Sequence, residues 1–163
     1  MDIIKATIRE WRELGFHYDR NDDRRVWTIT GSRTGIGRFS GLLRKFAADI
    51  RNDLLYEHDH YGPYCYLKIM NVPSERGFNS NAICAPRLDF EILADIVDSQ
   101  TTHAKTGDTF GIKQHFCPDS EYNLNLSVMD DDFDPGMFDS WVKEKISEQN
   151  DASKPDLHGF PDG

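Results

Sequence analysis

The hydrophobic positions of this chain switch several times between a helical and a strand period. Apolar residues at positions 39, 42, 43, 46, 47 and 50 follow the spacing of an amphipathic helix, which is the clearest helical signal in the chain. Similar spacing over residues 3–14, in the segment after Pro86, and from Phe138 to Ile146 predicts three more helices. Asp134 and Pro135 are suited to start the last of them.

Alternating apolar and polar residues predict strands between these helices. Residues 64–70 place Cys65, Leu67 and Ile69 on one face, so we expect a central strand here, with residues 57–60 as a polar loop before it. Residues 26–30 predict another strand, and residues 122–128 alternate as in a half-buried antiparallel strand.

The resulting order of elements predicts an α+β fold in one domain. We expect a largely antiparallel sheet with helices packed on one face, and the βαββαβ order between residues 26 and 116 is compatible with a ferredoxin-like core. Residues 1–147 are predicted to form the domain. Residues 148–163 are polar and are predicted to form a flexible tail.

The distribution of charge along the chain narrows the range of functions that the protein could have. The net charge is −9, and residues 105–163 hold 5 basic against 13 acidic side chains, which argues against nucleic-acid binding and fits a basic protein partner. No apolar run reaches the roughly 18 residues of a membrane span, and the first residues lack the pattern of a signal peptide. Three cysteines without a CxxC pair favour free thiols in a reducing compartment, so we expect a cytoplasmic protein.

The glycine-rich stretch from Gly31 to Gly37 resembles the phosphate-binding turn of short-chain dehydrogenases, and Tyr64 and Lys68 add a YxxxK spacing. The chain is too short for the doubly wound sheet of that family. A glycine-rich helix start capped by Ser32 or Thr34 is therefore the favoured interpretation, and no cofactor is expected. A nucleotide-dependent oxidoreductase remains an alternative.

Histidines and acidic residues form two further candidate sites. His58, Asp59 and His60 could serve a small ligand-binding domain or an enzyme, but they lack the spacing of a zinc site, so no metal is expected. The second cluster follows a predicted strand and would present carboxylates to a cationic partner; it consists of Asp130, Asp131 and Asp132. No catalytic residues are predicted.

The segment VWTITGSRTGIGRFSGLLRKFAADI, followed by YEHDHYGPYCYLKIM, resembles small bacterial immunity proteins of polymorphic toxin systems. The similarity covers residues 26–98, including the later LDFEILADIV, and its most specific element is HYGP at residues 60–63. It implies a non-enzymatic cytosolic inhibitor that binds one cognate toxin. We therefore expect an immunity protein that neutralises a toxin with a basic surface. Asp130, Asp131 and Asp132 are the first choice for the contact, and His58, Asp59 and His60 the second.

Overall fold

The computed structural model describes residues 2–153, which form helices and two separate sheets. The α+β class predicted from the sequence is confirmed. The α-helices are α1 (Ile3–Leu14), α2 (Arg33–Ala48), α3 (Asp89–His103), the short α4 (Lys113–Phe116) and α5 (Ser140–Ser153). Single 3-10 turns lie at η1 (Ile50–Asp53), η2 (Pro63–Cys65) and η3 (Pro135–Met137).

Local sequence signals set the ends of the helices. The Asp2 carboxylate accepts hydrogen bonds from the backbone N–H groups of Ile4 and Lys5 and so caps α1, which ends at Gly15 with a φ of 90°. The Ser32 hydroxyl accepts a bond from the Gly35 N–H at the start of α2. Asp134 caps η3 rather than the last helix itself, because α5 begins only at Ser140.

The strands form two four-stranded sheets with the same kind of layout. The first sheet has the order β1-β2-β8-β7 and the second β3-β4-β6-β5, and in each the two central strands are parallel while both outer strands pair antiparallel. The bounds in the first sheet are β1 (His17–Asn21), β2 (Val26–Gly31), β7 (Thr109–Gly111) and β8 (Asn123–Val128). Those in the second are β3 (His58–Tyr61), β4 (Leu67–Asn71), β5 (Gly77–Phe78) and β6 (Ile83–Ala85).

The division into two sheets does not support the ferredoxin-like core. That arrangement would place all four strands of the βαββαβ unit in one sheet, whereas β2 and β7 lie in the first sheet and β4 and β6 in the second. Antiparallel pairs still outnumber parallel ones, by four to two.

Two predictions about residues 57–70 are wrong in detail. The predicted loop is strand β3, because an exposed edge strand can be polar on both faces and gives no apolar alternation. The predicted strand over residues 64–70 begins only at Leu67, since Tyr64 and Cys65 have left-handed φ angles of 67° and 55° in η2. Strand β4 is nevertheless interior, between β3 and β6.

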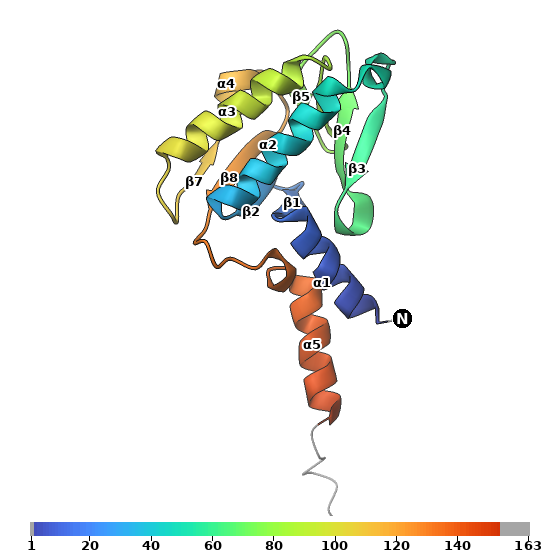
Figure 1. The fold of residues 1–163 in the computed structure, drawn as a ribbon, viewed down its shortest axis with the longest axis vertical. Coiled ribbons are helices and arrows are strands. Elements are labelled where there is room, and N and C mark those ends of the chain that lie inside the picture. The colour runs from blue at the N-terminus through green and yellow to red at the C-terminus, as the bar shows by residue number, and fades with distance from the viewer. Residues whose placement is uncertain (1, 154–163) are drawn as a thin grey trace, which may run out of the picture.

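Helices α2 and α3 pack together over the sheets, and α5 projects away from this body beside α1 (Figure 1). One hydrophobic core joins α2, α3 and both sheets; Phe39, Phe90, Leu126 and Ile69 are among its fully buried members. Helix α5 continues to Ser153, six residues beyond the predicted domain end. The rest of the predicted tail, residues 154–163, lies outside the described residues.

Candidate functional site

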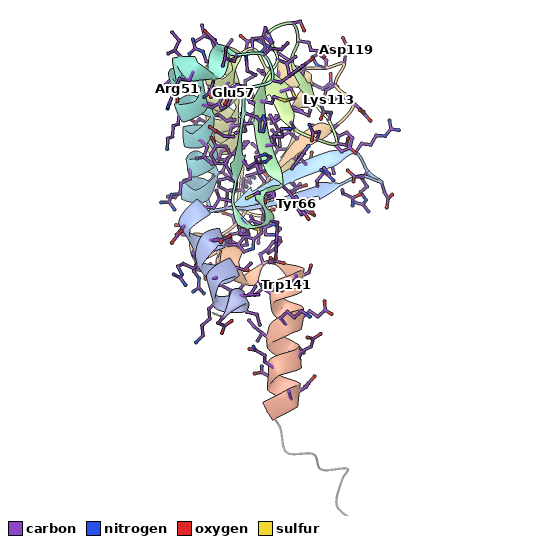
Figure 2. The ribbon with its side chains drawn as sticks, turned by 90° about the vertical axis from the view of Figure 1, so that its right-hand side faces the viewer. Arg51, Glu57, Tyr66, Lys113, Asp119 and Trp141 are labelled. Carbon is purple, nitrogen blue, oxygen red and sulfur yellow. The ribbon has the colours of Figure 1, made fainter. Side chains whose placement is uncertain are left out.

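A cleft of about 460 Å³ opens where α1, β1 and η2 meet the start of α5. Figure 2 shows Tyr66 at the lower end of the body, above Trp141 at the beginning of α5. Aromatic rings supply most of the walls: Trp11, His17, Tyr18, Trp27, Tyr64, Tyr66 and Phe138. Asp19, Arg20 and Asp139 add charge to this lining. The cleft is therefore an aromatic box with carboxylates in its wall.

Asp139 joins the elements around the cleft. The residue is only 5% exposed, and its carboxylate accepts hydrogen bonds from the Trp11 indole N–H at 2.9 Å and from the Tyr64 hydroxyl. Its other oxygen accepts the Trp141 backbone N–H at 2.9 Å and so caps α5. Within residues 2–153 this carboxylate has no ion pair with a basic side chain. Its negative charge is thus held in the cleft by neutral donors.

His17 carries the unsatisfied polar group of the cleft. Its ring stacks on Trp11 with centroids 4.4 Å apart and meets Phe138 edge-on. Its Nδ1 is buried and has no hydrogen-bond partner, which costs about 1–3 kcal/mol for an ordinary buried polar group. Burial lowers the pKa of His17, while the charges of Asp19 and Asp139 act in the opposite direction and that of Lys143 in the same direction. His17 is therefore neutral at pH 7.

This lowered pKa makes a prediction for stability. Below the ordinary histidine pKa of 6.5, the unfolded chain binds a proton at His17 that the folded chain does not, so folding free energy is lost as the pH falls towards the folded pKa. His17→Phe keeps a stacked ring but cannot titrate. As the pH is lowered from 7.5 to 5, the free energy of urea unfolding of His17→Phe should rise relative to that of wild type. The rise should be at most about 1.4 kcal/mol per pH unit. A difference that is constant with pH would contradict the prediction.

The η2 turn forms a strained wall of the cleft. Gly62, Tyr64 and Cys65 all have positive φ, which is costly for the two residues that have a side chain. The Tyr18 hydroxyl holds this turn, because it donates to the Pro63 carbonyl and accepts the Tyr66 N–H at 3.2 Å. Burial raises the pKa of Tyr18 to about 12, so the hydroxyl stays protonated and can donate. Strain of this kind is concentrated at binding and catalytic sites.

The charges around the cleft are of both signs, because besides Arg20 the Lys143 ammonium lies 5.5 Å from the centre of the Phe138 ring in the wall. Arg20 is its basic wall residue, but its guanidinium already pairs with Asp22 at 2.9 Å and donates to the Ser80 carbonyl. The same guanidinium lies 5.6 Å from the Trp27 ring centre, so the wall already stacks one cation on an aromatic face. Asp19 and Asp139 are left without a basic partner in residues 2–153.

The structure places His58, Asp59 and His60 on the exposed edge of the second sheet, away from the cleft lining. The two imidazole rings lie 5.0 Å apart on one face of β3, and each Nδ1 contacts a backbone carbonyl, of Tyr56 and of Cys65. Asp59 lies on the other face and accepts the Tyr61 hydroxyl at 3.2 Å.

Asp130, Asp131 and Asp132 are exposed in the turn that follows β8. This turn leaves the first sheet beside the end of β2, since the Met129 N–H binds the Gly31 carbonyl at 2.8 Å. Figure 1 shows β3 on the opposite side of the body from this segment. The structure therefore does not join the two predicted contact regions into one surface.

The glycine-rich stretch has a packing role in the structure. A Cβ atom at Gly35 would lie 2.4 Å from the Gly15 carbonyl oxygen, so the start of α2 can approach the end of α1 only through a glycine. Ser32 caps α2, and it was one of the two residues predicted to do so, the other being Thr34. The first sheet has four strands of mixed direction, unlike a doubly wound dinucleotide-binding sheet.

No family model matches this chain, and neither does a curated protein or a solved structure. In the part of the chain that the structure describes, no three metal-ligating side chains gather into a potential metal site. No helix between residues 2 and 153 has the length and apolar character needed to cross a membrane. The fold and the cleft thus define an α+β protein with an aromatic cleft that has carboxylates in its wall.

This cleft was not predicted from the sequence. Trp11 falls within the helix predicted over residues 3–14, Phe138 begins the last predicted helix, and Asp139 belongs to none of the predicted sites. One signal was present: nine of the chain's aromatic residues are tryptophan or tyrosine, which carry a polar group to be satisfied when buried. Their meeting point could not be read from the pattern, because Trp11 and Asp139 are 128 positions apart.

Proposed function

We propose that this chain is a non-enzymatic immunity-type protein that binds a cationic bacterial toxin and takes one basic side chain of the toxin into the aromatic cleft. The observation that carries the proposal is the buried Asp139 carboxylate, which lies in an aromatic wall without a basic partner in residues 2–153. The resemblance of residues 26–98 to immunity proteins supplies the class of partner.

An arginine side chain suits this cleft best. A guanidinium group stacks on aromatic faces and remains charged at all relevant pH values. Tyr66 is exposed and can cover such a group, whereas the Phe138 ring already has the Lys143 ammonium 5.5 Å from its centre. Asp19 at the wall and the buried Asp139 supply negative potential. The exposed Asp130, Asp131 and Asp132 would increase the rate of encounter with a basic partner without contributing to the cleft.

A small-molecule titration tests the cleft directly. N-acetyl-arginine amide should change the fluorescence of Trp11 and Trp27 with about millimolar affinity, as expected for one side chain. The citrulline analogue has nearly the same shape and no charge, and should not bind. Asp19→Asn/Tyr66→Ala removes one charge and one exposed wall and should weaken arginine binding about tenfold or more. Equal binding of both amides would refute the cationic site.

The identity of the partner needs a second experiment. Wild type and the variant Asp19→Asn/Tyr66→Ala should each be immobilised and exposed to an extract of the native cell. The proteins of interest are those that the wild type retains and the variant does not. The retained protein is expected to arrest growth when expressed alone, and coexpressed wild type should restore growth. A retained protein that is harmless, or that is neutralised equally by both forms, would overturn the proposed function.

The acidic turn makes a separate prediction about kinetics. Asp130→Asn/Asp131→Asn/Asp132→Asn should leave the melting temperature almost unchanged, because exposed charges contribute little to folding. It should slow association with the purified partner, and most strongly at low salt. Surface plasmon resonance at two salt concentrations measures this. An unchanged association rate would mean that the three aspartates do not attract the partner and serve only to form the turn before η3.

A further inference from the structure

A second surface of this protein lies at the other end of the body, where large apolar side chains are exposed. They come from η1 and the residues after it, and from the first turn of α3. Six of them are 44–73% exposed. We call them the η1–α3 patch: Ile50, Leu54, Leu55, Tyr56, Leu88 and Ile92.

Hydrogen bonds hold the two segments of the η1–α3 patch together. The Arg87 guanidinium pairs with Asp53 of η1 at 2.6 Å and also donates to the Ala47 carbonyl at the end of α2. Asn71 links the two segments of the patch. Its side-chain amide donates to the Leu54 carbonyl and accepts the backbone N–H of Arg87, each at 2.9 Å. Leu54 and Leu88 each directly follow a member of the Asp53–Arg87 pair. The patch is therefore a fixed surface rather than two independent loops.

The chemistry of this surface is that of an interface. Exposed apolar side chains are normally scattered on a monomer, and a cluster of six with a charged rim is typical of a contact between proteins. Arg51 and Glu57, both at the upper end of the body in Figure 2, belong to that rim. This end is opposite the cleft, so a partner here would leave the cleft open.

We infer that the η1–α3 patch binds the same patch of a second copy of this chain, giving a two-fold symmetric dimer. Charge complementarity argues for a second copy as the occupant. The two segments that form the patch, residues 50–57 and 87–92, hold two basic and four acidic side chains, so both signs are present on the same surface. In a two-fold contact each copy presents this same surface to the other. The Arg51 guanidinium, which pairs with Asp49 of its own chain and is 84% exposed, can then also face Glu57 or Glu91 of the other copy.

Sedimentation velocity of the full chain tests this dimer independently of any toxin. Wild type should shift from monomer to dimer as its concentration rises to about 100 µM, a range that covers dissociation constants in the micromolar region. Added salt should strengthen the dimer by screening the net charge, whereas it should weaken arginine binding in the cleft. Sedimentation as a monomer at every concentration would overturn the inference.

Matched variants locate the contact. Leu54→Glu/Leu88→Glu should abolish the dimer, and Leu54→Ser/Leu88→Ser should weaken it at least tenfold, so the test survives if the charged variant fails to fold. Ile3→Glu is the control, because Ile3 is 65% exposed on α1, outside the patch, and this variant should dimerise as wild type does. Dimerisation of the folded serine variant at wild-type affinity would refute the assignment to this surface.

Discussion

Asp139→Ala should lower the free energy of unfolding by about 3 kcal/mol, the largest effect expected for a single polar side chain in this protein. The change leaves the indole N–H of Trp11 without an acceptor, and Trp11 is only 1% exposed. It also removes the bond to the Trp141 N–H that caps α5, which accounts for about 1 kcal/mol of the loss. Tyr64 is 44% exposed and can turn its hydroxyl to water, so it adds little.

Urea unfolding followed by tryptophan fluorescence measures this loss, and two variants serve as controls. Asp139→Asn retains an acceptor oxygen and should be less destabilised than Asp139→Ala. Asp134→Ala removes a carboxylate that also caps a turn and pairs with Arg12, but at a more exposed position, so about 1 kcal/mol is expected. If Asp139→Ala were no more harmful than Asp134→Ala, Asp139 would not be the structural centre of the cleft.

Gly35→Ala and Gly37→Ala should change stability in opposite directions, although the two glycines lie only two positions apart in the same helix. A Cβ at Gly35 would meet the backbone oxygen of Gly15, and Gly15 has a φ of 90° at the end of α1 and cannot easily move. Overpacking of this kind costs about 1–3 kcal/mol. A Cβ at Gly37 meets nothing within 4 Å, so alanine should stabilise the helix by about 1 kcal/mol.

The comparison separates packing from phosphate binding as the reason for the glycine-rich stretch. Thermal unfolding should give a midpoint several degrees lower for Gly35→Ala than for Gly37→Ala, since 1 kcal/mol corresponds to about 2–4 °C in a chain of this size. Far-ultraviolet circular dichroism of both variants checks that each remains folded. Equal midpoints would mean that the contact between Gly35 and Gly15 is not what fixes the start of α2.

The sequence alone determined the elements whose signals are local. The spacing over residues 3–14 predicted α1 with its observed bounds, and the glycine after it marks its end. The serine at position 32 is the cap of α2, and alternation over residues 122–128 located β8 to within one residue. Each of these depends on side chains a few positions apart, so the chain carries the information within one window.

The tertiary structure decided how these elements combine. Strand β3 has no apolar face because it lies at an edge, and only its pairing with β4 makes it a strand. The split into two sheets depends on the parallel partners chosen by β2 and β4, which are β8 and β6. The cleft exists because the buried Asp139 accepts hydrogen bonds from Trp11 and Tyr64, which are 128 and 75 positions away. Contacts over such separations leave no period in the sequence, because they depend on the packing of the whole chain.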